Sequence, residues 1–222
     1  LIVGVPHPGD YATFNVADNT RSILFREEES GFLAGYAAVM EGFRTLGFMG
    51  GIAVPAVVRF GVGFVYGAGI AAQELEAEID VTNYDYLGTF APGDDVKTKA
   101  AAWYGNGVEA IFVAAGGAGN SVMAAAEEAD KTVIGVDIDQ ASQSDSVITS
   151  AMKALGVVVQ QALQDYVDGT FTGGTTLTLG AAEDAVALPL GDSFRFTNFT
   201  VADYEAILTR VKNGEFTIPT TE

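Results

Sequence analysis

One predicted strand ends in an acidic side chain, and the next is followed by a basic one. The segment KTVIGVDIDQ, residues 131–140, carries a β-branched run that ends at Asp137, and VITSAMK ends at Lys153. A buried run of this kind is typical of an open parallel sheet, which presents polar groups to a ligand at its carboxyl edge. A carboxylate accepts hydrogen bonds and donates none, so Asp137 would suit adjacent hydroxyls such as those of a ribose ring. The two side chains therefore indicate a binding cleft.

Both side chains also have a purely structural interpretation. Asp137 could cap a helix or a turn. Lys153, predicted just after a strand and at a helix start, could be an exposed helix lysine that merely offers charge to the solvent. The residues alone leave these interpretations open. Asp139 alternates with Asp137, and we expect it to cap the loop that leads to Ser142.

An aromatic side chain and two glycines follow two other predicted strands. In YDYLGTFAPGDD, Phe90 comes after the strand and not within it, where Tyr84 and Tyr86 alternate. An aromatic ring in that place could stack on a flat ligand ring, or it could pack at a hinge. In AIFVAAGGAGNSV, Gly116 and Gly117 directly follow a strand, where the backbone can approach a ligand closely. Their spacing does not match the G-x-G-x-x-G pattern of dinucleotide-binding proteins.

The residues offer little chemistry beyond this cleft. The chain has no cysteine, which excludes thiol catalysis, disulfides and thiolate metal sites. Its one histidine, His7 in PHPGD, has no partner motif, and we expect it to be an exposed loop residue. H-E-x-x-H, G-x-S-x-G and the P-loop pattern are all absent from the sequence. We therefore expect no catalytic residue, no metal site and no cofactor.

The charge balance also excludes classes of partner. Twenty-nine acidic residues against eleven basic ones give a net charge of −18 and a pI near 4.1. Such a charge opposes binding to nucleic acid or to an anionic membrane surface. The longest apolar runs are interrupted by Arg59 or are rich in glycine, so no membrane-spanning segment is predicted.

Short β-branched or aromatic runs alternate with longer alanine-rich runs, as in βαβ units with a parallel sheet. The strands are predicted at 1–5, 21–25, 46–50, 80–87, 109–114, 132–137 and 146–149, and the helices at 30–43, 55–76, 94–105, 119–128, 151–168 and 201–212. After Gly169 the sequence becomes rich in glycine and threonine, which predicts a pair of β segments before the last helix.

The segment FREEESGFLAGYAAVM begins with three glutamates at the start of a predicted helix. Glutamates face the positive end of the helix there, so we expect them to be structural. The small residues Gly31, Ala34, Gly35 and Ala38 would let this helix pack close to a sheet.

Several blocks of the sequence, taken in order, resemble the basic membrane protein family. The blocks are FREEESGFLAGYAA (25–38), LGFMGG (46–51), VVRFGVGFVYGA (57–68), YLGTFAPGDDVKTKAAAWYGNGVEAIFVAAGGAGNSVMAAAEE (86–128), VIGVDIDQ (133–140) and VITSAMK (147–153). They cover most of residues 20–170. The family comprises substrate-binding lipoproteins of ABC importers and includes the purine nucleoside receptor group.

The resemblance implies an α/β fold of the type I periplasmic-binding-protein class, with two parallel-sheet lobes joined by a hinge. Residues 45–153 would form the second lobe, residues 1–44 and 154–190 a partial first lobe, and residues 191–222 a segment of uncertain lobe. Relatives carry a Ser-Phe-Asn segment that contacts the base. Phe14 and Asn15 lie too close to the next block to match it. We therefore expect an incomplete first lobe that lacks the base-recognising residues.

The resemblance also implies a function and a location. The chain would capture a purine nucleoside between the lobes and deliver it to an ABC transporter permease. The ligand would contact Asp137, Lys153, Phe90, Gly116 and Gly117. The protein would be extracytoplasmic, either periplasmic or held at the cell membrane by a lipid anchor upstream of this chain.

Three alternatives remain open at this stage. The ligand could be another small solute, such as a sugar or a flavin. The chain could be a ligand-sensing regulator of the same fold, although that role calls for a partner-binding or DNA-binding appendage. A nucleoside hydrolase would need an acidic metal cluster or a catalytic base, for which the D-x-D at 137–139 is a weak basis.

Overall fold

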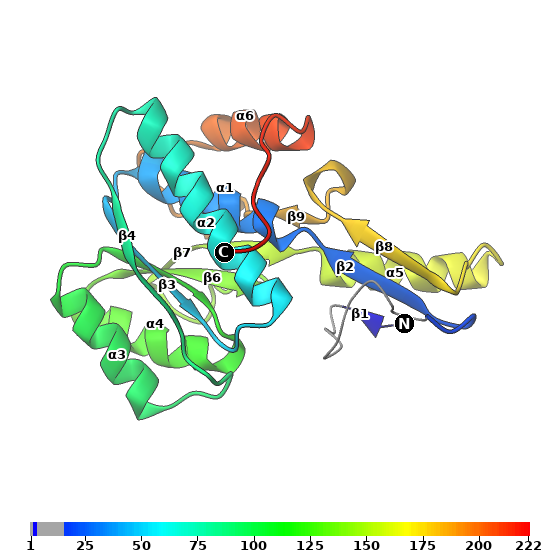
Figure 1. Ribbon diagram of the computed structural model, residues 1–222, viewed down its shortest axis with the longest axis horizontal. Helices are drawn as coiled ribbons and strands as arrows, with labels where there is room; N and C mark the ends of the chain where they lie inside the picture. The colour runs from blue at the N-terminus through cyan, green and yellow to red at the C-terminus, as the bar shows by residue number, and fades with distance from the viewer. Residues whose placement is uncertain (1, 4–15) are drawn as a thin grey trace.

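Two sheets of unequal size organise the chain in the computed structural model, which describes residues 2, 3 and 16–222 (Figure 1). The larger sheet has the strand order β4-β3-β5-β6-β7-β9, and the smaller has the order β1-β2-β8. All neighbouring strands are parallel except β7 and β9. The expectations for His7, Phe14 and Asn15 lie outside the described residues.

The strands are β1 (Ile2–Val3), β2 (Arg21–Phe25), β3 (Thr45–Gly50), β4 (Asp80–Tyr86), β5 (Ala110–Ala114), β6 (Thr132–Asp137), β7 (Val147–Lys153), β8 (Thr175–Leu179) and β9 (Val186–Ala187). The helices are α1 (Glu27–Glu41), α2 (Pro55–Glu74), α3 (Asp94–Gly105), α4 (Gly119–Ala129), α5 (Leu155–Val167) and α6 (Val201–Lys212). Short 3-10 turns occur at η2 (Gly116–Ala118), η3 (Ala181–Glu183) and η4 (Gly191–Ser193).

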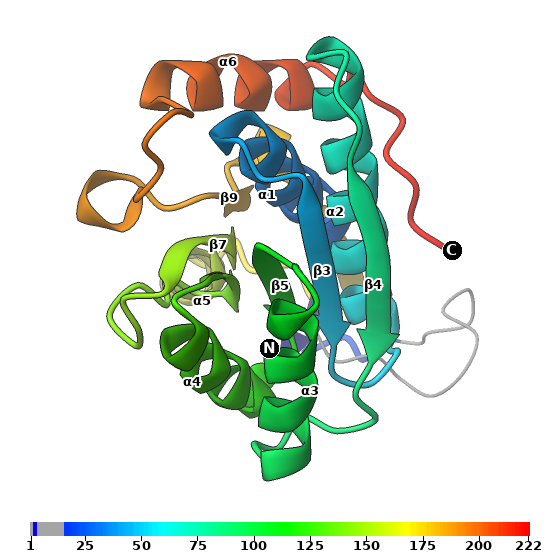
Figure 2. The same cartoon turned by 90° about the vertical axis from the view of Figure 1, so that its left-hand side faces the viewer.

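Helices cover both faces of the larger sheet. Figure 2 shows α1 and α2 on one side of β3 and β5, and α3 and α4 on the other. Side chains alternate between the two faces along a strand, so Phe112 of β5 packs against Phe64 of α2, while its neighbours Ile111 and Val113 pack toward α3 and α4. Because neither face meets water, every residue of β5 is buried. This is why the strand reads as a continuous apolar run.

Helices α1 and α2 are packed backbone to backbone. Gly31 and Gly35 of α1 face α2, and Gly63 and Gly67 of α2 face α1. A Cβ atom added to any of these four glycines would overlap a backbone carbonyl oxygen of the facing helix. The sequence prediction that the small residues of α1 pack against a sheet is therefore wrong for the two glycines, because their partner is another helix.

Helix α2 is long and apolar enough to cross a membrane by length and composition. Half of its most apolar window is buried inside the protein, and it packs on α1, β3 and β5. These contacts are those of a core helix.

The chain crosses between the two sheets at three places, after β2, after β7 and after β8. Backbone hydrogen bonds tie the crossings together: Arg26 N–H donates to the Leu179 carbonyl at 2.9 Å, and Ala154 N–H donates to the Ala185 carbonyl at 2.8 Å. Beyond the crossings, β2, β8 and α5 extend away from the larger sheet (Figure 1). The arrangement is that of two α/β parts joined by a hinge.

The lobe boundaries at residues 45, 154 and 190 stay a prediction. Two elements expected in the first lobe, however, contact elements expected in the second. Helix α1, expected in the first lobe, packs on α2 and β7. Strand β9, also expected there, pairs with β7 in the larger sheet. Helix α6, for which the sequence predicts no lobe, lies against α1. Assignment of these three elements to a lobe stays a prediction.

One predicted boundary is wrong at a place that matters for function. The sequence predicts a strand at 146–149 and a helix from 151, whereas β7 continues to Lys153 and α5 begins at Leu155. Ser150, Ala151 and Met152 suit a helix start by composition, but they pair in register with the end of β6. Lys153 is therefore the last residue of a strand.

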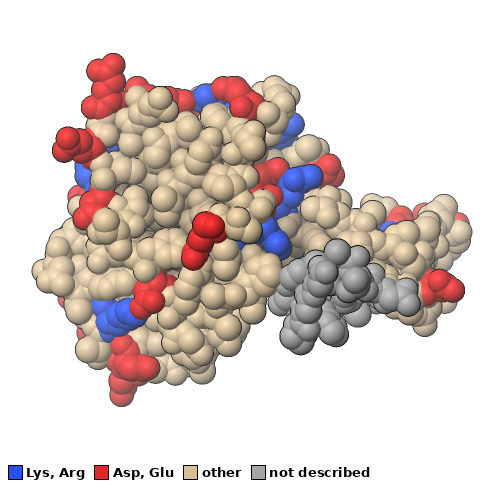
Figure 3. All heavy atoms as spheres, in the orientation of Figure 1, with Lys and Arg blue, Asp and Glu red and all other residues tan. Residues whose placement is uncertain are grey.

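Charged side chains are unevenly spread over the surface. On the face shown in Figure 3, most acidic groups lie around the edge, a few groups of both signs lie further in, and the area between them is uncharged. The described part of this face carries no broad basic area of the kind that binds a phosphate backbone.

Candidate ligand-binding site

A pocket of about 320 Å³ opens at the carboxyl ends of β5, β6 and β7, beside the first turn of α2. After β3 the chain first adds β4 on one side of it in the sheet. It then returns to add β5 on the other side. The pocket thus lies by the point where the strand order reverses, which is where open α/β sheets bind ligands. Its lining residues are Val54, Ala56, Val57, Phe60, Phe90, Ala114, Gly116, Val136, Asp137 and Lys153.

Asp137 enters the pocket from a strained turn. Its φ is +68°, and the N–H of Ile138 donates to the carbonyl of Val136 at 2.8 Å. A bond from residue i+2 to residue i with a positive φ between them is the rarer form of γ-turn. Non-glycine residues in this region cost about 1–3 kcal/mol each and tend to occur at functional sites. The prediction that Asp137 ends a strand is confirmed, whereas its contact with a ligand stays a prediction.

The Asp137 carboxylate faces a lysine but keeps room for a ligand. Lys153 Nζ lies 2.8 Å from Asp137 Oδ1. That oxygen is buried, yet among the described residues it has no hydrogen-bond donor of acceptable geometry, so we regard the contact as an ion pair without a directed hydrogen bond. The side chain as a whole is 44 % exposed. The carboxylate can therefore still accept hydrogen bonds from a solute.

Lys153 is held from several sides. Its side chain is only 10 % exposed, and Nζ lies 3.8 Å from a carboxylate oxygen of Glu27. The ammonium also lies 5.7 Å from the ring centre of Phe25 and 5.5 Å from that of Phe60, within the range of a cation–π contact. The exposed-lysine interpretation is therefore wrong, because the strand end points this side chain into a largely buried position.

Glu27 and Arg59 do not line the pocket, but they extend the ion pairs of Lys153, a role that the sequence did not indicate. The Glu27 side chain is 1 % exposed, and Arg59 Nε donates to its Oε2 at 2.7 Å. Four charges of alternating sign thus run from Arg59 through Glu27 and Lys153 to Asp137. Buried charges need such pairing, since their desolvation is costly. The three helix-start glutamates carried no sequence signal that would single out Glu27, because its partners are distant in sequence.

Phe90 forms another wall of the pocket. Its ring packs over Gly51, and its carbonyl accepts the N–H of Ala118 at 3.0 Å. Gly116, at φ +53°, lines the pocket beside Phe90. A Cβ on Gly117 would lie 3.2 Å from the Phe90 carbonyl oxygen, so this glycine supports the segment that carries the ring. Stacking of Phe90 on a ligand stays a prediction.

Asp139 turns the chain beyond the pocket. Its Oδ1 accepts the N–H of Ala141 at 3.0 Å. The prediction that this residue caps the loop that leads to Ser142 is confirmed.

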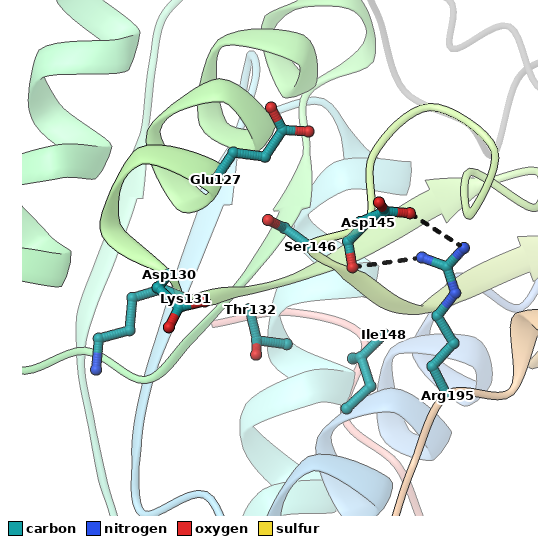
Figure 4. Close-up of a pocket in the computed structure, with 8 residues that line it drawn as sticks. All are labelled: Glu127, Asp130, Lys131, Thr132, Asp145, Ser146, Ile148 and Arg195. Atoms are coloured by element: carbon teal, nitrogen blue, oxygen red, sulfur yellow. Dashed lines mark hydrogen bonds and ion pairs between the residues drawn. The ribbon is translucent and has the colours of Figure 1, made fainter.

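A larger pocket of about 430 Å³ lies at the opposite edge of the sheet, where β6 and β7 begin (Figure 4). Arg195 reaches into it and donates to the backbone carbonyls of Ala141, Ser144 and Val147, each at 3.1 Å. Its guanidinium is thus used to hold the connection between β6 and β7. We therefore place the candidate site in the smaller pocket, where Lys153 pairs with the partly exposed side chain of Asp137.

Within residues 2, 3 and 16–222, no cluster of three or more His, Asp or Glu side chains could hold a metal ion. In particular, Asp139 of the D-x-D bonds its own loop.

Glu28, the neighbour of Glu27, should destabilise the fold at neutral pH. Burial raises the pKa of Glu28, and the Arg59 charge 3.7 Å away only partly opposes this shift. A carboxyl whose pKa is higher in the folded state stabilises the fold while it is protonated, and this contribution is lost as the pH rises through that pKa. Glu28→Gln should therefore raise the melting temperature at neutral pH. The gain should shrink as the pH falls through the raised pKa of Glu28 and should be gone below the ordinary carboxyl pKa.

Glu27→Gln is the matched control on the same helix turn. It removes a carboxylate that Arg59 holds directly, so it should lower the melting temperature at neutral pH. Melting curves between pH 4 and pH 8, taken as about the range over which carboxyl groups titrate, check both results. A lower melting temperature for Glu28→Gln at neutral pH would show that the Arg59 attraction outweighs burial.

Comparison with known proteins identifies relatives over nearly the whole chain. Residues 9–222 match the Bmp family, described as "ABC transporter substrate-binding protein PnrA-like". The chain is 33 % identical over 221 residues to the ABC transporter nucleoside-binding protein BmpA of Lactococcus lactis subsp. cremoris, covering 90 % of this chain and 60 % of that protein. It is 34 % identical over 192 residues to basic membrane protein D of Borreliella burgdorferi, covering 84 % of this chain and 55 % of that protein.

Solved structures share the fold. A solute-binding protein of an ABC transporter system from Aeropyrum pernix K1 is similar with a TM-score of 0.80 and 23 % identity, over 98 % of this chain and 70 % of that chain. A transcriptional activator of the comK gene from Bacillus halodurans is similar with a TM-score of 0.71 and 19 % identity, over 90 % of this chain and 68 % of that chain. The expected fold class is confirmed. The chain spans about 60 % of the length of the curated relatives it matches.

Proposed function

This chain belongs to the PnrA-like family of ABC transporter substrate-binding proteins, and we propose that it captures a nucleoside, with a purine nucleoside as the favoured ligand. The observation that carries the proposal is the Asp137 carboxylate, which lies beside Lys153 at the sheet edge on a side chain that is 44 % exposed. The L. lactis relative, named as a nucleoside-binding protein, supports the same ligand class.

The pocket suits the two halves of a nucleoside. Two neighbouring ribose hydroxyls can donate to the Asp137 carboxylate, and the Lys153 ammonium can donate to a hydroxyl oxygen. The Phe90 ring on the same pocket offers a flat apolar face to a base, a contact worth about 1–3 kcal/mol per base. A sugar without a base would bind at the polar half of this pocket. It would contact the Phe90 ring less than a nucleoside would.

The rest of the transport role follows from the family. The loaded protein would dock on an ABC transporter permease and hand over its solute outside the cytoplasm, periplasmic or lipid-anchored at the cell membrane. The solute would leave chemically unchanged, because the two charged residues that line the pocket, Asp137 and Lys153, form an ion pair with each other. Binding of a sugar or a flavin, or a sensing role of the same fold, are the competing outcomes.

A ligand panel tests this proposal. Adenosine, guanosine and inosine should each raise the melting temperature of the full-length protein, because a ligand at 100 times its dissociation constant adds about 2.7 kcal/mol of stability. Ribose, glucose and riboflavin should have little effect at equal concentration. The same incubations, followed by chromatography, should release no free base. Stabilisation by a hexose or by riboflavin alone would move the assignment to that solute.

A further inference from the structure

We propose that Gln140 is a positioning residue for ligand binding, because it fixes the turn from which Asp137 enters the pocket. The proposal rests on the proposed function, since it takes Asp137 as the acceptor for the ligand. Gln140 lies three residues beyond Asp137, at the start of the connection between β6 and β7, and it acts on the ligand only through Asp137.

Two hydrogen bonds tie Gln140 to both strands that carry the site. Its Oε1 accepts the N–H of Val136 at 2.8 Å. Its own N–H donates to the Ser150 hydroxyl oxygen at 3.1 Å. Val136 directly precedes Asp137 on β6, and Ser150 lies on β7 three residues before Lys153. Gln140 therefore links the strand end of Asp137 to the strand of its ion-pair partner.

The Gln140 side chain also replaces a missing strand partner. In the described sheet, β6 pairs with β5 over Thr132 to Ile134, whereas its pairing with β7 continues to Asp137. Beyond Ile134, the N–H of the buried Val136 is satisfied by the Gln140 side chain instead. A buried donor that loses its acceptor costs its full desolvation energy, so this end of β6 depends on Gln140.

Gly135 leaves the space that this arrangement needs. A Cβ atom on Gly135 would lie 2.6 Å from Gln140 Oε1 and 2.7 Å from the Ser150 hydroxyl oxygen. Any side chain at this position would therefore displace the Gln140 amide or the Ser150 hydroxyl. Gly135, Gln140 and Ser150 act together in one small interlocked unit.

The turn at Asp137 needs such support because it is strained. A residue at φ +68° persists only where its surroundings hold it there. Val136, whose N–H is bound by Gln140, also supplies the carbonyl that closes the turn with Ile138. Loss of the Gln140 acceptor would release this turn and let the Asp137 carboxylate move away from Lys153.

Two substitutions at one position separate positioning from general damage. Gln140→Met keeps the length of the side chain and removes the acceptor, so it should weaken adenosine binding about tenfold, the factor expected from one lost hydrogen bond. Gln140→Glu retains an acceptor oxygen and should bind adenosine within about threefold of the wild type. Affinities are measured by calorimetric titration of the full-length protein at neutral pH, and melting temperatures are recorded for each variant. Ser150→Ala should show a smaller loss than Gln140→Met.

Two control variants alter the same connection, one from within it and one from a residue that holds it. Ser142→Ala changes an exposed side chain of this loop and should leave adenosine affinity unchanged. Arg195→Met frees the far end of the connection, so it should lower the melting temperature and retain affinity. An equal loss of affinity in Arg195→Met and Gln140→Met would overturn the proposal, because general loosening of the loop would then explain both. Unchanged adenosine affinity in Gln140→Met would overturn it as well.

Hydrogen exchange separates this proposal from the proposed function. If the wild-type protein binds no nucleoside, the proposed function fails, and exchange of the Ile138 amide in the ligand-free protein decides the positioning role. Faster exchange in Gln140→Met, restored in Gln140→Glu, would uphold Gln140 as the residue that holds the Asp137 turn. Exchange equal to the wild type in both variants would overturn it.

Discussion

Asp137→Ala should weaken binding of a purine ribonucleoside by about 1.5–3 kcal/mol for each ribose hydroxyl that the carboxylate accepts. The reason is that a charged acceptor is removed while Lys153 stays in place, 3.8 Å from Glu27. The loss should be far smaller for a 2′,3′-dideoxynucleoside, which lacks the hydroxyls. Asparagine tolerates the positive φ and keeps one acceptor oxygen. The ribonucleoside affinity of Asp137→Asn should therefore lie between those of the wild type and Asp137→Ala. Calorimetric titration with both ligands measures these differences.

Phe90→Ala is the contrasting variant for this experiment. Stacking depends on a flat ring and not on hydroxyls, so this variant should weaken the ribonucleoside and the dideoxynucleoside alike, by about 1–3 kcal/mol. Equal losses for both ligands in Asp137→Ala would show that the carboxylate does not bind the ribose. A large fall in melting temperature with unchanged affinity would make Asp137 a structural turn residue.

Gly63→Ala should destabilise the fold strongly although it adds a single methyl group. The new Cβ would overlap the backbone carbonyl of Glu28 on α1, and a backbone atom cannot rotate away as a side chain can. Overpacking costs about 1–3 kcal/mol where side chains can adjust, and we expect at least the upper end of that range here. The added methyl group should displace α1. Because α1 also carries Glu27, this displacement should reach the ligand site. Urea unfolding measures the change in free energy.

Gly69→Ala is a matched control on the same helix. Apart from its chain neighbours and the backbone of its own helix, no heavy atom of the described residues lies within 4 Å of a Cβ built there. Alanine is favoured over glycine by about 0.5–1 kcal/mol inside a helix, so this variant should be slightly more stable than the wild type. If Gly63→Ala and Gly69→Ala changed the free energy of unfolding by a similar amount, α1 and α2 could move apart without a loss of stability.

The ligand edge of the larger sheet could be predicted because its signals are local. A buried strand between two helical layers needs an unbroken apolar run, and VIGVD and AIFVA are such runs. Parallel strands end at one edge, so the residue that ends each run must lie near the others. Phe90, Gly116, Asp137 and Lys153 accordingly line one pocket.

The residue composition could not predict where β7 ends and α5 begins. Met152 and Lys153 suit a helix start, yet pairing with β6 and β9 keeps them in a strand. A hydrogen-bonded neighbour on each side stabilises a strand more than helix propensity stabilises one turn, because tertiary context routinely overrides propensity. Because Lys153 ends a strand and does not begin a helix, its side chain is largely buried.

What the sequence determined by itself is the alternation of strands and helices, the acidic surface and the polar residues at the strand ends, since each depends on neighbours a few positions away. The tertiary structure decided which of these groups meet. Glu27 pairs with Arg59 and Lys153, and the glycines of α1 meet those of α2. Contacts between residues far apart in sequence form only when the elements pack, so no local pattern could pair Glu27 with Lys153.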